Sequence, residues 1–132
     1  MEKADIKILL VDDEIEVTKI LSKRLGRRGY CCATADNGAI CLEKLNEFPA
    51  NIVIMDVKMP VMNGIEALGI LVQKYPHCKV VLLSGHADMQ MAVSAMSKGA
   101  FGYLMKPVDF DELFFKIEDA VREIELEVAH IE

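Results

Sequence analysis

The segment Asn51-Ile52-Val53-Ile54-Met55-Asp56 decides the fold, because an unbroken apolar run is followed at once by a carboxylate. The segment Lys79-Val80-Val81-Leu82-Leu83 repeats the same unbroken apolar pattern. A strand that is apolar at every position, rather than at every second one, is covered on both faces. These two segments therefore predict central strands of a parallel sheet that lies between layers of helices.

Three more strand-like segments and five helical stretches surround these two strands. Strands are predicted over 6–11, 30–35, 51–56, 79–83 and 101–105. Helical periodicity or capping signals indicate a helix before Gly29, one over 39–47, one from Asn63 with Glu66 as its capping box, one from Asp88 to Gly99 and one after Asp109. Strict alternation of strands and helices implies right-handed crossovers, so the fold class is α/β with a doubly wound parallel sheet.

Length and composition exclude several classes of protein. The chain of 132 residues is one domain's length, and 52% hydrophobic residues rule out a disordered tail. The net charge of −6 argues against a protein that grips nucleic acid or an anionic membrane. The polar start is not a signal peptide and no segment is long enough to cross a bilayer, so we expect a cytoplasmic protein. Its four cysteines form no zinc-site spacing and are expected to be reduced thiols.

Polar residues follow the predicted strands at the edge where their carboxyl ends meet. Asp12 and Asp13 end the first strand and Asp56 ends the third. Ser84-Gly85 and Lys106-Pro107 follow the fourth and fifth strands. Ligands of an open parallel sheet bind outside these carboxyl ends. The sequence therefore predicts three carboxylates, a hydroxyl and an ammonium in one site.

This set of groups suits phosphoryl transfer. Three neighbouring carboxylates repel one another, and ionising all of them needs a cation such as Mg²⁺, which prefers oxygen ligands. A carboxylate can act as the nucleophile and form an aspartyl phosphate. The Lys106 ammonium could pair with phosphoryl oxygens, the Ser84 hydroxyl could bond to one of them, and Gly85 leaves room for the group to enter.

The same residues carry a resemblance that covers about 6–122. Val11-Asp12-Asp13-Glu14, the run from Met55 to Gly64, Ser84-Gly85 and Lys106-Pro107 resemble the signature set of receiver domains of two-component response regulators. The resemblance implies a flavodoxin-like sheet of order 2-1-3-4-5 with five helices. It implies a signalling domain rather than an enzyme, which takes a phosphoryl group from a sensor histidine kinase or phosphotransfer protein.

The resemblance also implies a role for each motif residue. Asp56 would be the phosphoacceptor, assisted by Ser84 and Lys106, whose bond to Pro107 would be cis. Asp12, Asp13, Asp56 and the backbone carbonyl of Lys58 would hold Mg²⁺. Ser84 and Tyr103 would be the switch residues that reshape the surface of the fourth helix, fifth strand and fifth helix. The tuning positions would be Lys58, Gly85 and His86, and we hypothesise that Lys58 and His86 slow hydrolysis of the phosphorylated state.

Other functions fit the residues less well. A haloacid-dehalogenase-like phosphatase also uses an aspartate nucleophile. In that class the nucleophile follows the first strand in a D-x-D pattern, whereas this chain has Asp12-Asp13-Glu14 after its first strand. A flavodoxin-like FMN carrier would place phosphate beside two repelling carboxylates. An inert interaction module would not keep the full site. No direct contact with nucleic acid or membrane is expected.

The acidic charge lies in the last predicted helix. Residues 109–132 hold 9 acidic and 2 basic residues, whereas residues 1–108 hold 12 acidic and 13 basic residues. Apolar residues of this helix are spaced alternately by four and three, as in a coiled-coil seam. They are Phe110, Phe114, Ile117, Val121, Ile124, Val128 and Ile131. We therefore predict a receiver domain over 1–122 and a helical extension over 123–132, which is a possible coiled-coil linker. A homodimer could form through this helix or through the switch surface.

Overall fold

Five parallel strands form one sheet in a computed structural model that describes residues 1–131. The strands are β1 (Lys7–Val11), β2 (Cys31–Ala35), β3 (Ile52–Asp56), β4 (Lys79–Ser84) and β5 (Gly102–Met105). Their order is β2-β1-β3-β4-β5, which confirms the predicted doubly wound sheet. β3 is buried at every residue, and β4 at every residue after the first. The unbroken apolar runs thus do mark the centre of the sheet.

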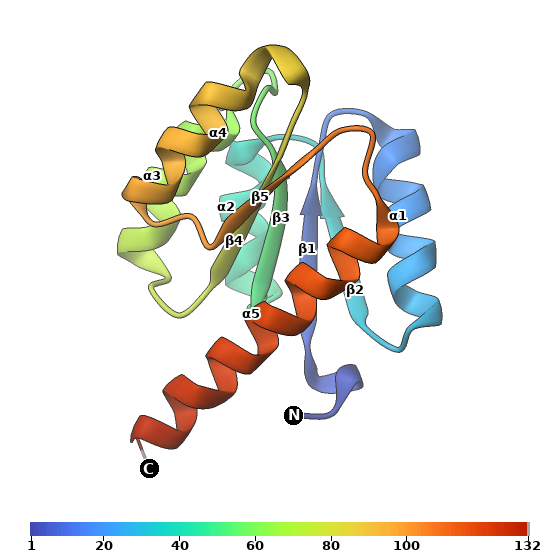
Figure 1. Ribbon diagram of the computed structural model, residues 1–132, viewed down its shortest axis with the longest axis vertical. Helices are drawn as coiled ribbons and strands as arrows, with labels where there is room; N and C mark the ends of the chain where they lie inside the picture. Colours follow the sequence, from blue (N-terminus) through green and yellow to red (C-terminus); the bar gives the residue numbers. More distant parts are fainter. Residues whose placement is uncertain (132) are drawn as a thin grey trace.

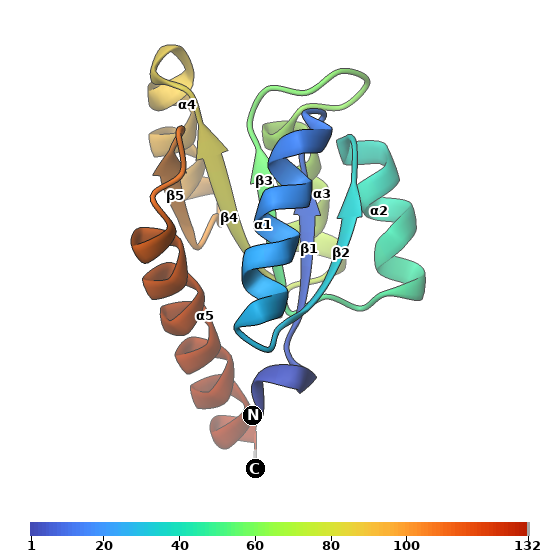
Figure 2. The ribbon, with the colours of Figure 1, turned by 90° about the vertical axis from the view of Figure 1, so that its right-hand side faces the viewer.

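Five α-helices cover the two faces of this sheet (Figure 1). They are α1 (Ile15–Arg27), α2 (Gly38–Glu47), α3 (Gly64–Lys74), α4 (Met89–Ala95) and α5 (Phe110–Ile131), with short 3₁₀ turns at Lys3–Asp5, His86–Asp88 and Met96–Lys98. One apolar layer joins the sheet to α2, α3 and α4, and a second joins it to α1 and α5 (Figure 2). No helix in the described part of the chain combines the length and apolar character that a membrane crossing requires.

The predicted helix ends are confirmed at most positions. The chain turns through positive φ at Gly29 after α1 and at Gly99 after the 3₁₀ turn that follows α4. Asn63 and Glu66 form both bonds of a capping box at the start of α3. Asp109 accepts hydrogen bonds from two backbone N–H groups of the first turn of α5. Asp88 differs, because it precedes α4 without a capping bond from its side chain.

Two arginines of α1 stack on two phenylalanines of α5. The guanidinium carbon of Arg24 lies 4.1 Å from the ring centre of Phe110, and that of Arg28 lies 3.8 Å from that of Phe114. Besides a favourable interaction with the helix dipole, the basic end of α1 thus has cation–π partners on α5. They fix the start of α5 against the C-terminal end of α1.

The packing of α5 continues beyond residue 122. Ile124 is only 8% exposed and belongs to the core between α5 and the sheet. Glu127 pairs with Lys79 at the start of β4, and α5 extends past the amino ends of the strands (Figures 1 and 2). Leu126 and Val128 are exposed. A linker over 123–132 stays a prediction, and the side chain of Ile131 and all of Glu132 lie outside the described residues.

The four cysteines differ in accessibility, which gives a direct test of the packing. Cys31 is exposed, whereas burial raises the pKa values of Cys41 and Cys78 to about 12. The thiolate is the reactive form, so these two thiols react slowly at neutral pH. We expect iodoacetamide at pH 7.5 to label Cys31 first and to label Cys41 and Cys78 only after denaturant is added. Peptide mass spectrometry checks the order, and early labelling of Cys41 would contradict this packing.

Candidate functional site

The three predicted carboxylates meet at the carboxyl edge of the sheet. Asp12 and Asp13 follow β1, and Asp56 is the last residue of β3, the strand paired with β1. One carboxylate oxygen from each of the three residues lies within 4.8 Å of the others. Asp12 and Asp56 are buried, and Asp13 is exposed. The topology thus brings residues 44 positions apart into one acidic cluster.

Lys106 reaches into this cluster from the end of β5. Its ammonium nitrogen lies 2.8 Å from Asp12 Oδ2, 3.1 Å from Asp56 Oδ2 and 3.2 Å from Glu14 Oε1. The bond from Lys106 to Pro107 is cis, in agreement with the resemblance. The lysine therefore partly neutralises the carboxylates and stands where a group attached to Asp56 would meet it.

The charges of the site shift the pKa values of both partners. Burial raises the pKa of Asp56, and the nearby charge of Asp12 raises it further, whereas Lys106 and the backbone of Lys58 lower it by less. Burial would lower the pKa of Lys106, but its contacts with Asp12 and Asp56 outweigh burial and raise that pKa well above its usual value. Lys106 therefore stays cationic, and the ionised form of Asp56 carries an unfavourable energy in the folded state.

The acidic cluster suits a hard divalent cation. The 2.8 Å contact between Lys106 and Asp12 Oδ2 lacks hydrogen-bond geometry, so this buried oxygen has no hydrogen-bond donor among the described residues. Lys106 offsets the charge of this oxygen but does not fill its hydrogen-bonding capacity, so a second cation can approach it. Together with exposed Asp13 it supplies the oxygen ligands that Mg²⁺ prefers. These residues therefore fit the predicted magnesium site.

The loop between β3 and α3 is held closely against Asp56. The N–H of Gly64 donates to the carbonyl oxygen of Val57 at 2.8 Å. A Cβ atom on Gly64 would lie 2.4 Å from the backbone oxygen of Asp56, so only glycine fits this approach. In the same loop Val61 has a φ of 68°, and the N–H of Met62 donates to the carbonyl of Pro60 across it. This tight turn shapes the chain beside the carboxylates.

The two predicted switch residues lie at the carboxyl end of β4, which is Ser84, and within β5, which holds Tyr103. Ser84 is fully buried, and its hydroxyl donates to the carbonyl oxygen of Gly85 at 2.9 Å. Tyr103 is half-buried on β5 and lines a hollow between α4 and α5 together with Met96, Met105 and Lys116. The carbonyl oxygen of Ser84 accepts a hydrogen bond from the backbone N–H of Lys106 at 2.9 Å, which joins the end of β4 to the residue that reaches Asp56. Ser84 is next to Met105 of β5 in the strand register, so the two predicted switch residues lie on neighbouring strands.

The predicted tuning residues do not all face the same pocket. Lys58 and Gly85 line the pocket around Asp56, with Met59 and Pro60. His86 is exposed and is not among the described residues that line this pocket. Asp88 and Glu14 line it, although no role was predicted for either. Glu14 stood within the quoted motif, but nothing in the spacing indicated its ion pair with Lys106.

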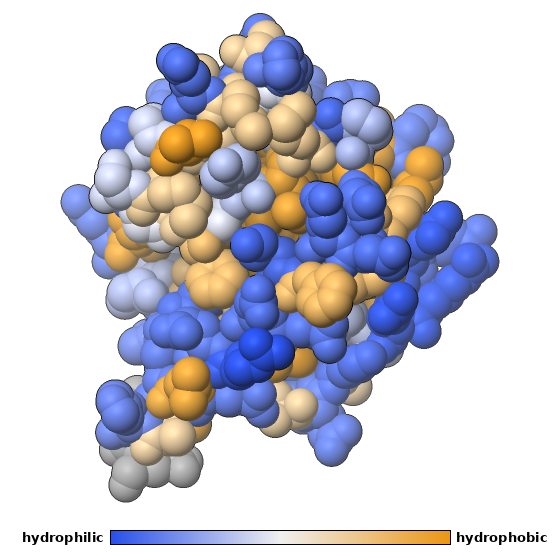
Figure 3. Space-filling view, in the orientation of Figure 1, coloured by the Kyte–Doolittle hydropathy of each residue, from blue (hydrophilic) through white to orange (hydrophobic). Residues whose placement is uncertain are grey.

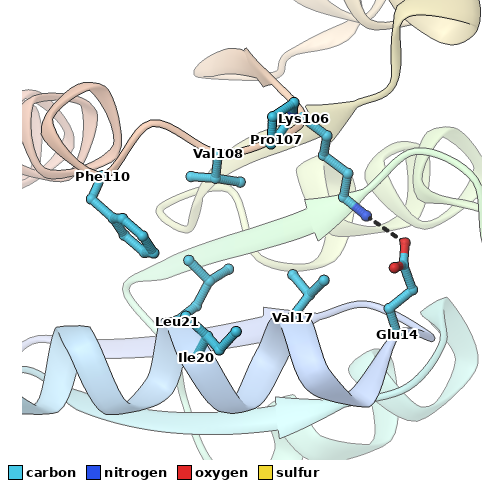
Figure 4. A pocket seen from close by; sticks show the side chains of 8 residues that line it. All are labelled: Glu14, Val17, Ile20, Leu21, Lys106, Pro107, Val108 and Phe110. Carbon is cyan, nitrogen blue, oxygen red and sulfur yellow. Dashed lines mark hydrogen bonds and ion pairs between the residues drawn. The ribbon is translucent and has the colours of Figure 1, made fainter.

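A second hollow lies directly beside the acidic cluster (Figure 4). Val17, Ile20 and Leu21 of α1 face the loop after β5 across it. The remaining lining residues are Glu14, Lys106, Pro107, Val108 and Phe110. The hollow is thus an apolar groove that ends at the Glu14–Lys106 ion pair, and this pair separates the groove from the pocket of Asp56.

Comparison with known proteins gives consistent matches. The family model described as the response regulator receiver domain matches residues 8–118. The DNA-binding transcriptional regulator NtrC of Escherichia coli is 36% identical over 114 residues, which are 86% of this chain and 24% of NtrC. The transcriptional regulatory protein GlrR of Escherichia coli is 37% identical over 116 residues, which are 88% of this chain and 26% of GlrR. The chain spans about a quarter of the length of these relatives.

Solved structures agree with these matches. A response regulator receiver domain protein from Clostridium thermocellum has a TM-score of 0.88 and 34% identity, and the match covers 92% of this chain and 98% of that one. The structure of NtrX from Brucella abortus in complex with ADP also has a TM-score of 0.88, with 28% identity, over 96% of this chain and 30% of that one. Nothing in these matches supports the alternative of a phosphatase.

Proposed function

This chain belongs to the family of response regulator receiver domains of two-component systems, and from that premise we propose that Asp56 is the residue that accepts the phosphoryl group. The observation that carries the proposal is the position of Asp56. It is 6% exposed, lies 3.1 Å from the Lys106 ammonium and shares an acidic cluster with Asp12 and Asp13. The carboxylate of Asp56 therefore has the Lys106 ammonium as one neighbour and the carboxylates of Asp12 and Asp13 as the others.

The proposed transfer uses a phosphohistidine of a histidine kinase or phosphotransfer protein as donor. A carboxylate oxygen of Asp56 forms a bond to phosphorus while the bond from phosphorus to the imidazole nitrogen breaks. The imidazole leaves with that electron pair, and the product is an acyl phosphate on Asp56. Lys106 is already within 3.1 Å of Asp56 Oδ2, so its ammonium can pair with the added phosphoryl oxygens. In this proposal the domain is a phosphorylated switch rather than an enzyme.

We propose three magnesium ligands from the same geometry and the fourth, at Lys58, from the family resemblance. Asp12, Asp13, Asp56 and the backbone carbonyl of Lys58 would hold Mg²⁺, which neutralises negative charge on a phosphoryl group when it is bound. The buried Asp12 oxygen without a donor and the exposed Asp13 carboxylate support this set. Asp12 would then exchange its contact with Lys106 for one with the cation, which leaves the ammonium to Asp56 and Glu14.

The proposed output is a change in the surface formed by α4, β5 and α5. Ser84 can turn its hydroxyl from Gly85 toward a phosphoryl group, and the space this frees allows Tyr103 to move inward from its half-buried position. Met91, Val93 and Met96 of this region are exposed, and Figure 3 shows apolar side chains at the surface over α4 and β5. A partner protein or a second copy of the chain could bind the changed surface.

Absence of contact with nucleic acid stays a prediction, since NtrC is named a DNA-binding regulator.

A small acyl phosphate tests the proposed function. The protein is incubated with acetyl phosphate, once with Mg²⁺ and once with EDTA, and intact-mass spectrometry measures the added phosphoryl group. We expect one phosphoryl group per chain with Mg²⁺ and little or none with EDTA. No mass increase in either sample, or the same increase in both, would contradict the proposal.

Lys58 is expected to slow hydrolysis more than His86 does. Lys58 lines the pocket of Asp56, so its ammonium can pair with the phosphoryl group and shield it from water, whereas His86 does not line the pocket. Loss of one exposed ion pair is worth up to about 1 kcal/mol, which is roughly fivefold in rate. We therefore expect Lys58→Ala to raise the hydrolysis rate roughly fivefold and His86→Ala to change it less. Mass spectrometry after donor removal measures the decay, and an unchanged rate in the double variant would sink the hypothesis.

A further inference from the structure

Glu14 connects two elements at the mouth of the site. Its Oε1 accepts a hydrogen bond from the Lys106 ammonium at 3.2 Å, and the two residues are 92 positions apart in the chain. Figure 4 shows this contact where the apolar groove ends. Both residues line the groove and the pocket of Asp56. A phosphoryl donor that seats in the groove must therefore pass this pair to reach Asp56.

Local helix structure does not explain this position of the Glu14 side chain. Glu14 precedes α1 as its N-cap, but its side chain makes no capping hydrogen bond. Its backbone N–H donates to Asp12 Oδ1 at 2.9 Å, while the carboxylate reaches across to Lys106. The side chain of Glu14 is 64% exposed, and an ion pair in such a setting adds little to stability. The ion pair instead holds a negative charge at the mouth of the site and restrains the side chain of Lys106.

This negative charge opposes the approach of anionic donors. Three acidic residues line the pocket besides Glu14, against two lysines, and Glu14 adds a further carboxylate at its entrance. The acidic residues are Asp13, Asp56 and Asp88, and the lysines are Lys58 and Lys106. A charge at such an entrance changes the association of charged reactants through the local field. Glu14 also competes with an incoming phosphoryl group for Lys106. The repulsion by Glu14 and its competition for Lys106 both slow phosphorylation, and they slow it more for a donor with more negative charge.

We propose that Glu14 is a specificity-determining residue that selects phosphoryl donors of low negative charge, with Lys106 as the group it restrains. This inference rests on the proposed function of Asp56 as phosphoacceptor. A phosphohistidine on a docked protein is delivered along the apolar groove, where contacts with the groove can compensate for the repulsion by Glu14. A small dianion in solution meets the full repulsion of Glu14. The residue thereby favours a docked protein donor over free acyl phosphates.

Two small donors of different charge test this selection. Acetyl phosphate carries two negative charges at neutral pH and phosphoramidate carries one. Phosphorylation rates are measured by intact-mass spectrometry with Mg²⁺ at low salt for wild type, Glu14→Gln and Glu16→Gln. Glu16 is the matched control, because it is an exposed acid of the first turn of α1 and forms no ion pair with any residue that the structure describes. Thermal melts confirm that both variants fold.

The expected result is a change in the ratio of the two rates. Glu14→Gln should raise the rate roughly fivefold with acetyl phosphate and roughly twofold with phosphoramidate, whereas Glu16→Gln leaves the ratio unchanged. At about 1 M salt the Debye length falls to about 3 Å and the difference should largely disappear. Equal gains with both donors, or the same gain in Glu16→Gln, would overturn the inference. If wild type is not phosphorylated by either donor, the proposed function fails instead.

Discussion

Replacing Asp56 with asparagine is expected to abolish phosphorylation and at the same time raise the melting temperature. The amide has no carboxylate oxygen to form an acyl phosphate, so the loss of modification should be complete within detection. The stability gain follows from the raised pKa of Asp56, because burial and the charge of Asp12 make its ionised form unfavourable in the folded state. We expect a Tm a few degrees above wild type at pH 7 in metal-free buffer.

The size of this gain in stability depends on pH in a way that can be measured. A carboxyl group whose pKa is raised by folding contributes most to stability below its ordinary value of 3.8 and loses that contribution as pH rises through the raised value. The advantage of Asp56→Asn should therefore be full at pH 7 and shrink toward pH 4. Asp36→Asn is the control, since Asp36 is an exposed acid that follows β2 at the same edge of the sheet. A lower Tm for Asp56→Asn than for wild type would show that its pairing with Lys106 outweighs burial.

Replacing Gly64 with alanine is expected to cause the largest loss of stability among the changes considered. The added Cβ would lie 2.4 Å from the backbone oxygen of Asp56 and 3.0 Å from the Cα of Val57. Neither atom belongs to a flexible side chain, so the start of α3 must shift away from the site. We expect a loss of about 2–4 kcal/mol in the free energy of unfolding, as for other severe backbone clashes. Acyl phosphate should also modify the variant more slowly, because the shift moves the backbone of Asp56.

Gly69 supplies the matched control within the same helix. A Cβ atom on Gly69 would meet nothing within 4 Å, and the residue is exposed in the interior of α3. Gly69→Ala should therefore gain roughly 0.5–1 kcal/mol from higher helix propensity. Urea denaturation followed by circular dichroism measures both variants. If the two substitutions had similar effects, the close approach of α3 to Asp56 would be wrong.

Much of the architecture could be predicted because local patterns and topology point the same way. Unbroken apolar runs placed β3 and β4 at the centre of the sheet, and residues at strand ends were bound to share one edge. The sheet therefore had to bring Asp56 to Asp12 and Asp13. The capping box of Asn63 could also be predicted, since its bonds lie within four residues.

Contacts between distant side chains could not be predicted in this way. The sequence does not indicate that Glu14 bonds to Lys106 or that Arg28 stacks on Phe114, because neither pair follows from strand order or helix period. The burial of Ile124 depends on how far α5 follows the sheet, and a heptad pattern looks alike whether its partner is a sheet or a second helix. The resemblance implied a tuning role for His86, but this residue begins the 3₁₀ turn after β4 and lies outside the lining of the pocket.

The most direct test of the central claim is the chemical identity of the phosphorylated residue. The chain is phosphorylated with acetyl phosphate and Mg²⁺, and borohydride then cleaves the acyl phosphate and converts the modified aspartate to homoserine. Peptide mass spectrometry locates that homoserine. We predict homoserine at residue 56 and at no other aspartate. Homoserine at Asp12 or Asp13, or a phosphoryl group that resists borohydride on a serine, would contradict the account.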